Sequence, residues 1–136
     1  MIPFHEVEPR LREFLEGRAD LDRVAAHLYG SVARGEARPG SDVDLAVLGR
    51  GPPPKTYAGL RPRLALEGEL EALLGRPVQL LSLEGAPADL VHEVLRAGRL
   101  VLERDRAARV AFEVRRRNEY FDLLPILREY RRLAPS

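Results

Sequence analysis

The stretch of sequence that decides the fold runs from Leu28 to Leu48 and reads Leu-Tyr-Gly-Ser-Val-Ala-Arg-Gly-Glu-Ala-Arg-Pro-Gly-Ser-Asp-Val-Asp-Leu-Ala-Val-Leu. It begins inside an apolar run over residues 23–29, which Gly30 stops, and it ends with a second apolar run over residues 43–48. Short apolar runs that contain Val and Tyr and are bounded by Gly and Pro favour buried strands over helices. We therefore expect two β-strands here, joined by a connection that carries most of the polar side chains.

Two carboxylates, Asp42 and Asp44, stand at the start of the second expected strand with one residue between them. Alternate side chains of a strand point to the same face, so both carboxylates project together. Carboxylates this close repel each other unless a positive charge lies between them, and Mg²⁺ prefers such oxygen ligands. The pair therefore indicates a metal site, although by itself it also fits a strand end where both acids are solvated or one caps a turn.

Gly30 and Ser31 directly follow the first expected strand, where a helix can start. Backbone amides at such a start bind phosphate, glycine permits a close approach, and a serine hydroxyl caps the helix or bonds a phosphate oxygen. Arg34 lies three residues further on, about one helical turn away, where it can reach a triphosphate. Taken alone, these residues are more simply read as an ordinary strand-to-helix turn beside a solvated arginine.

Outside this stretch, the hydrophobic pattern changes between helical and strand periods. The expected elements are helices over residues 7–17, 60–74 and 87–97, strands over 77–83 and 99–103, and a charged helical stretch from residue 104 onward. Pro125 is expected to kink or divide that last stretch. The resulting order α-β-β-α-β-α-β-α predicts an α/β or α+β fold in which helices pack on a small mixed β-sheet.

Composition limits the class of protein. A chain of 136 residues suits one domain, here residues 1–136 with 104–136 as a C-terminal helical extension. Lys+Arg is 22 and Asp+Glu is 21, a net charge of +1, whereas a general nucleic-acid binder usually has a clear basic excess. Cysteine is absent, which excludes disulfides and thiolate zinc sites. The apolar stretches are short, so we expect no membrane span or signal peptide and a cytoplasmic location.

The charge is uneven along the chain. Residues 104–136 hold nine arginines against five acidic residues, a net +4, so residues 1–103 carry −3. Arg115-Arg116-Arg117 does not form one nucleic-acid patch, because three consecutive helical residues span about 300°. We interpret the basic extension as a surface that meets a protein. Its apolar side chains fit a partner interface and core packing equally well; they are Tyr120, Phe121, Leu124 and Leu127.

Gly30-Ser31, ten intervening residues and then Asp42-Val-Asp44 resemble the signature of the nucleotidyltransferase superfamily that includes DNA polymerase beta. The fuller string, Gly-Ser-Val-Ala-Arg-Gly followed by Ser-Asp-Val-Asp-Leu, is similar to the minimal nucleotidyltransferase branch. In that family, Gly-Ser holds the nucleotide triphosphate and the Asp pair binds two Mg²⁺ ions. The resemblance therefore implies nucleotide binding, with ATP as substrate, at Gly30 and Ser31. It implies catalysis and metal binding at Asp42 and Asp44.

Two neighbours of this motif are further candidates for nucleotide binding. Arg34 would neutralise charge as pyrophosphate departs. Ser41, directly before the Asp pair, either orients a carboxylate or is only a turn residue.

One position departs from the family pattern. The segment from Arg76 to Leu83 is similar to the family's third strand, where a further acid is usual, but this chain has Gln79 there. Glutamine ligates a metal only through its carbonyl and cannot act as a general base. Glu84 is a nearby substitute, at or beyond the strand end. The chain therefore either catalyses slowly, activates the acceptor elsewhere, or binds nucleotide without turnover.

The segment from Glu119 to Pro125 resembles the C-terminal helix of minimal nucleotidyltransferases that are paired with HEPT-domain proteins. That resemblance implies transfer of AMP from ATP to a tyrosine of a HEPT toxin, which makes the chain an antitoxin in a hetero-oligomer; a homodimer stays open. The small size of the chain also favours a small acceptor or a protein hydroxyl over a nucleic-acid end. The alternative is a catalytically weak nucleotide-binding module that neutralises its partner by contact.

Overall fold

The computed structural model describes residues 2–18, 23–51 and 55–134. In chain order its elements are the 3-10 helix η1 (Phe4–Glu6), α1 (Val7–Glu16), β1 (Ala25–Tyr29), α2 (Gly30–Ala33), β2 (Val43–Leu48), α3 (Tyr57–Leu74), β3 (Val78–Ser82), α4 (Ala88–Ala97), β4 (Arg99–Glu103) and α5 (Arg106–Leu133). Each strand lies within two residues of the bounds that the sequence predicts. The short helix α2 starts directly where β1 ends.

The four strands form one mixed sheet in the order β3-β2-β1-β4. Strand β1 runs antiparallel to both β2 and β4, whereas β2 and β3 are parallel. Strand β2 therefore lies inside the sheet, and residues from three strands can meet around each of its ends. The prediction of a small mixed sheet with helices packed on it is confirmed.

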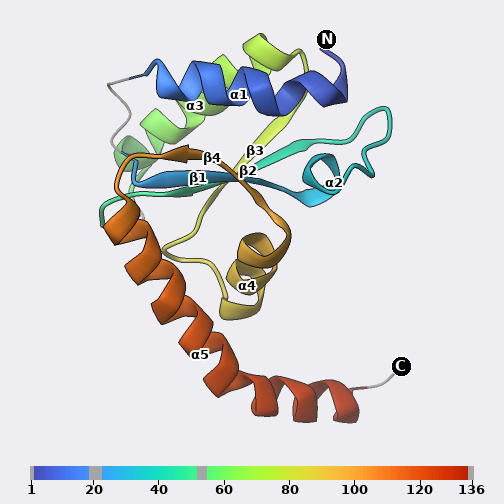
Figure 1. The fold of residues 1–136 in the computed structure, drawn as a ribbon, viewed down its shortest axis with the longest axis vertical. Coiled ribbons are helices and arrows are strands. Elements are labelled where there is room, and N and C mark those ends of the chain that lie inside the picture. The colour runs from blue at the N-terminus through green and yellow to red at the C-terminus, as the bar shows by residue number, and fades with distance from the viewer. Residues whose placement is uncertain (1, 19–22, 52–54, 135–136) are drawn as a thin grey trace.

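Helices cover both faces of this sheet, with α1 and α3 on one side and α4 and the start of α5 on the other (Figure 1). Val43 and Leu45 of β2 belong to the core under α1 and α3. Ala46 and Leu48 belong to the core under α4 and α5. Because side chains of a strand alternate between the faces, Asp44 falls on the α4 face.

Helix α3 begins three residues before the position 60 that the apolar pattern indicates. The side chain of Thr56 caps it by accepting a hydrogen bond of 3.1 Å from the backbone N of Gly59. Its end is at the predicted place, because Gly75 adopts a left-handed φ of 65° directly after the last turn. A polar cap, rather than the hydrophobic pattern, therefore sets the start of this helix.

The long helix α5 begins at a cap formed by the side chain of Asp105. Phe112 is buried against the body of the protein, and the ring of Tyr120 stacks on His92 of α4 with the centroids 3.8 Å apart. Pro125 lies inside α5 and does not divide it; the helix changes direction in its C-terminal half, as Figure 1 shows. Among the described residues, no helix is long and apolar enough to span a membrane.

Candidate active site

The two predicted metal ligands stand at the N-terminal end of β2. In the register of the sheet, Asp44 lies opposite Tyr29 of β1 and Gln79 of β3. Asp42 directly precedes the strand, and its Oδ2 accepts a hydrogen bond of 2.9 Å from Nε2 of Gln79. Both aspartates are half-buried, whereas Gln79 is exposed. The fold thus gathers the Asp pair and the doubtful third position at one place.

The surroundings of Asp44 oppose its negative charge. Burial, and then the charge of Asp42, raise the pKa of the Asp44 carboxyl above its ordinary value, and the opposing effect of Arg34 is smaller. Neither carboxylate forms an ion pair with any residue that the structure describes. Two adjacent carboxylates without a counter-ion are the ligand set that fits a hard divalent cation such as Mg²⁺.

Gly30 allows the Asp44 carboxylate to lie against the backbone at the start of α2. Its φ of 76° belongs to the left-handed region, which costs other residues about 1–2 kcal/mol. A Cβ at this position would also overlap Oδ2 of Asp44. Glycine is therefore required for two reasons, its conformation and the close approach. Ser31 follows it in the first turn of α2 and is half-buried.

The two further candidates for nucleotide binding already have partners in the protein. Arg34 is exposed, and its Nε donates to Oε2 of Glu36 at 3.1 Å. The hydroxyl of Ser41 accepts a hydrogen bond of 2.9 Å from the backbone N of Arg38 and closes a turn. Of the two interpretations of Ser41, this bond favours the turn residue. Arg34 is different, since it still acts on the charge of Asp44 and its exposed partner is easily exchanged.

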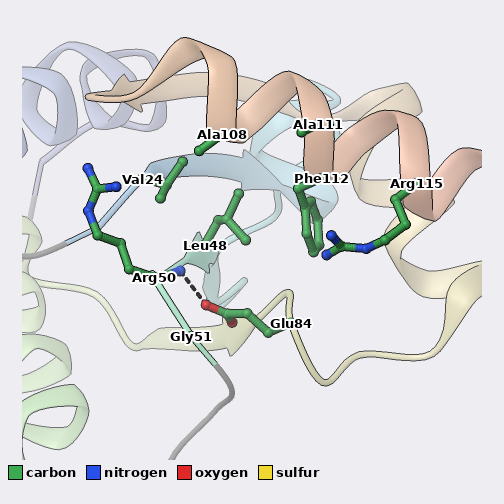
Figure 2. Close-up of a pocket in the computed structure, with 10 residues that line it drawn as sticks. Val24, Leu48, Arg50, Gly51, Glu84, Ala108, Ala111, Phe112 and Arg115 are labelled. Carbon is green, nitrogen blue, oxygen red and sulfur yellow. Dashed lines mark hydrogen bonds between the residues drawn. The ribbon is translucent and has the colours of Figure 1, made fainter.

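Glu84 lies at the opposite end of β2 from the Asp pair. Its Oε1 accepts a hydrogen bond from the backbone N of Gly49, the residue that follows β2 (Figure 2). Because β3 is parallel to β2, each residue after Gln79 moves the chain ~3.3 Å further from the Asp pair. Glu84 as a substitute for the third acid is therefore wrong; its carboxylate completes the hydrogen bonding at the far end of the sheet.

A hollow of about 530 Å³ opens at this far end, between β2 and the first turns of α5 (Figure 2). Leu48 and Phe112 give it an apolar floor, and Arg50, Glu84 and Arg115 border it. Its one acidic side chain is the carboxylate that already binds a backbone amide. The hollow therefore lacks the unpaired carboxylates that mark the other end of β2.

Two residues outside the Gly-Ser and Asp-x-Asp motif also influence the site. Burial, and then the charge of Asp44, raise the pKa of the Tyr29 hydroxyl, while Arg63 opposes this change. Arg63 belongs to α3 and donates through Nη2 to the carbonyl oxygen of Leu80 at the free edge of β3. The sequence offers no signal for Arg63, because its position depends on how α3 packs beside the sheet.

Comparison with protein families gives the class of this chain. Residues 11–107 match the family described as Polymerase beta, Nucleotidyltransferase. The matched range contains all four strands and the Asp pair. The chain therefore belongs to the polymerase beta nucleotidyltransferase family. A comparison with curated proteins gave no match.

Solved structures with the same fold include both single proteins and complexes. A chain of a toxin–antitoxin crystal structure with AMP-PNP is 20% identical with a TM-score of 0.67, over 90% of this chain and 97% of that one. A complex of tri-AMPylated Shewanella oneidensis HEPN toxin with MNT antitoxin contains a chain that is 18% identical with a TM-score of 0.62, over 91% and 98%. A minimal nucleotidyltransferase is 33% identical with a TM-score of 0.57, over 71% and 94%.

Proposed function

We propose that the protein is a Mg²⁺-dependent nucleotidyltransferase that transfers AMP from ATP to a hydroxyl group of a partner protein. The observation that carries this proposal is the pair of half-buried carboxylates, Asp42 and Asp44, which form no ion pair with any described residue; Asp44 also lies against the left-handed Gly30. Such a pair costs folding free energy unless a ligand uses it. Membership in the nucleotidyltransferase family supports the reaction class.

Asp42 and Asp44 would hold the cation in this reaction. Bound Mg²⁺ would supply positive charge that orients the triphosphate and stabilises the leaving pyrophosphate. Gly30 would let phosphate oxygens approach the backbone, and the half-buried Ser31 offers a hydroxyl donor beside them. Arg34 would exchange its exposed bond to Glu36 for phosphate, since such exposed pairs contribute only about 0–1 kcal/mol.

The transfer exchanges one phosphorus–oxygen bond for another. The acceptor oxygen forms a bond to the α-phosphorus of ATP, and the bond from that phosphorus to the bridging oxygen of pyrophosphate breaks. The acceptor proton passes to solvent, because the amide of Gln79 has no basic atom to take it. What the residues of this chain contribute is charge and orientation, which are large terms in phosphoryl chemistry.

We propose that the partner, a HEPT-domain protein, binds the C-terminal part of α5. In residues 121–133 of this helix no side chain is buried, and Ile126 and Tyr130 are 65% and 74% exposed. A helical segment of this length is marginal in water unless something covers it. At about 100° per residue, its apolar side chains cover roughly two-thirds of the circumference, which suits a groove between partner helices.

The charges around this apolar face indicate what borders the groove. Arg132 is paired with Glu129, whereas Arg128 and Arg131 form no ion pair with any described residue. An acidic rim on the partner would therefore complement them. The toxin–antitoxin complexes among the structural neighbours support a protein partner of this kind.

The transfer is tested with ATP labelled at the α-phosphate, Mg²⁺ and, as the proposed partner, a HEPT-domain protein from the same organism. We expect label on the partner with the wild-type chain and none with the Asp42→Asn/Asp44→Asn double variant. Equal labelling by the two, or none by either, contradicts the catalytic proposal.

Partner binding is tested separately by calorimetry with Ile126→Asp and Tyr130→Asp. Each should weaken binding at least 10-fold by burying a charge in an apolar contact. Leu64→Asp, which changes a half-exposed leucine of α3, is the matched control and should bind like the wild type. Unchanged affinity in all three variants would show that the C-terminal part of α5 does not bind the partner.

A second candidate function is neutralisation of the partner by contact alone, and the hydrogen bond from Gln79 to Asp42 favours it, because the site then lacks a general base. A neutralisation assay with the Asp42→Asn/Asp44→Asn variant separates the two functions. Full protection by that variant supports contact, and lost protection supports chemistry.

A further inference from the structure

Gln79 presents its amide nitrogen, not its amide oxygen, to the Asp pair. Nε2 of Gln79 donates to Oδ2 of Asp42 at 2.9 Å, and the residue stands opposite Asp44 in the parallel register of β2 and β3. An ionised carboxylate only accepts hydrogen bonds, so the donor end of the amide must face it. Gln79 is thus bound to one of the expected metal ligands and does not act as a ligand itself.

Among the residues that the structure describes, Asp42 and Asp44 form the carboxylate pair at this end of β2, whereas the carboxylates of Glu67 and Glu71 accept from backbone N atoms of β3. Over the part of the chain that the structure describes, no three or more His, Asp or Glu side chains are placed to hold a metal ion together. One divalent cation balances the charges of Asp42 and Asp44. Two divalent cations about 3.5–4 Å apart carry four positive charges, and before nucleotide binds the two aspartates would compensate only half of them.

Gln79 cannot easily become the missing ligand. Offering its Oε1 to a cation requires the amide to turn, which takes Nε2 away from Asp42 and gives up their hydrogen bond. Hydrogen bonds to charged groups are roughly twice as strong as those between neutral groups, so this loss opposes the turn. A neutral oxygen would replace it without adding the negative charge that a second cation needs.

We propose that, before nucleotide binds, Asp42 and Asp44 hold a single divalent cation, and that Gln79 is a positioning residue that orients Asp42 and, being neutral, adds no charge for a second cation. The resemblance to the family implies two ions, and the Gln79–Asp42 contact is the observation that separates this chain from that expectation. Residues beyond a metal's own ligands commonly set its affinity in this way.

Provided that the proposed function holds, the amide at position 79 also restricts the acceptor. No carboxylate stands there to take the acceptor proton, and a missing general base costs about 10²–10⁴-fold. A hydroxyl that ionises readily is least affected. Tyrosine, with a pKa of about 10, meets this requirement far better than an aliphatic hydroxyl. The amide at position 79 is therefore consistent with the tyrosine acceptor that the family resemblance already implies.

Counting bound Mn²⁺ by electron paramagnetic resonance tests the inference without any transfer reaction. The full chain is titrated with Mn²⁺ alone, and circular dichroism checks that each variant is folded. We expect one uncoupled ion in the wild type and two magnetically coupled ions in Gln79→Asp. Gln79→Ala should keep one ion with affinity lowered about 10–100-fold. Leu64→Asp adds the same charge at an exposed position of α3 outside the Asp pair and should behave like the wild type.

Each outcome decides part of the inference. Two ions in the wild type, or a single ion in Gln79→Asp, would overturn the exclusion of a second cation. Unchanged affinity in Gln79→Ala would overturn the positioning role, and no bound Mn²⁺ in the wild type would overturn the whole inference. The transfer assay is read independently of the ion count. Labelling of the partner together with two bound ions would support the proposed function and contradict this inference. One bound ion without labelling would support this inference and contradict the proposed function.

Discussion

Carboxylates lie at both ends of β2, but the protein stabilises the negative charge at one end and opposes it at the other. At the C-terminal end, Glu84 binds the backbone amide of Gly49 and completes the hydrogen bonding of the sheet. At the N-terminal end, Asp42 and Asp44 repel each other, and burial adds to the cost of charging Asp44. A carboxylate with its own donor stabilises a fold, whereas an uncompensated pair costs folding free energy and needs a ligand.

The comparison also separates the shape of a site from its chemistry. The hollow of about 530 Å³ lies at the Glu84 end, yet the unpaired carboxylates lie at the other. Leu48 and Phe112, which line the hollow, are almost completely buried and supply no charge. The catalytic hypothesis rests on two carboxylates whose negative charge no ion pair with a described residue balances.

The largest difference in transfer rate between the two ends of β2 should come from replacing one carboxylate at each end by its amide. Asp44→Asn should lower AMP transfer about 10²–10³-fold, because an electrostatic element of the transition state is lost. Glu84→Gln keeps an oxygen that accepts from Gly49 and should leave transfer unchanged. Rates of label transfer under saturating ATP check this, and equal losses in the two variants would break the comparison.

Gly30→Ala tests the close approach at the Asp end. The new Cβ overlaps Oδ2 of Asp44, and a displacement of about 1 Å at a reacting centre can cost 10²-fold in rate. Gly35→Ala is the matched control, because Gly35 also has a positive φ of 72° but nothing near a Cβ. Both variants should lose about 1–2 kcal/mol of stability, and only Gly30→Ala should lose transfer. A similar loss of transfer in both would point to backbone strain alone.

Glu84→Ala tests the structural role of the other end. The backbone N of Gly49 loses a charged, partly buried acceptor, so unfolding by urea should show a loss of about 1–3 kcal/mol. Glu84→Gln should recover most of that loss. AMP transfer at a temperature where both variants are folded should match the wild type; reduced transfer would mean that the far end takes part in the reaction.

The smallest expected effect is a change of stability with pH at the Asp end. The pKa of Asp44 is raised in the folded state, so its favourable contribution is present below the unfolded value of 3.8 and is lost as pH rises through the folded pKa. At neutral pH, Asp44→Asn should therefore stabilise the fold, by about 1 kcal/mol or less because the group is partly screened by solvent. Thermal unfolding at pH 3 and pH 7 checks this sign.

A divalent cation gives the complementary readout. Mg²⁺ should raise the melting temperature of the wild type at neutral pH, because it binds the folded state and compensates the Asp pair. It should leave the Asp42→Asn/Asp44→Asn variant unchanged. A rise of equal size in both proteins would place the binding elsewhere.

Much of the architecture follows from local patterns. The strand at residues 43–48 and the end of α3 before Gly75 were predictable, because apolar periodicity and a glycine that adopts positive φ act over a few neighbouring residues. The start of α3 was predicted three residues late, since the Thr56 cap leaves no trace in the hydrophobic pattern. The position of Arg63 had no local signal, as it depends on how a helix packs beside β3.

In the C-terminal extension, two adjacent aromatic residues have different surroundings in the fold. Tyr120 and Phe121 were equally compatible with core packing and with a partner interface. In the fold, Tyr120 stacks on His92, whereas Phe121 is 53% exposed. Adjacent helical residues point about 100° apart, so Tyr120 lies flat on the His92 ring, whereas Phe121 meets that ring at a steep angle with the centroids 6.1 Å apart and stays half-exposed.

By itself, the sequence determined the elements, the placement of Gly30 at the end of a strand, and the Asp pair with its shared face, because these depend on neighbours along the chain. Only the tertiary structure decided that Gln79 reaches Asp42 while Glu84 serves the opposite end of the sheet. Strand order and direction cause this difference, since the parallel pairing of β2 and β3 fixes which residues, distant in sequence, share an end. Pairing of this kind is set by packing of the whole chain, which no local pattern records.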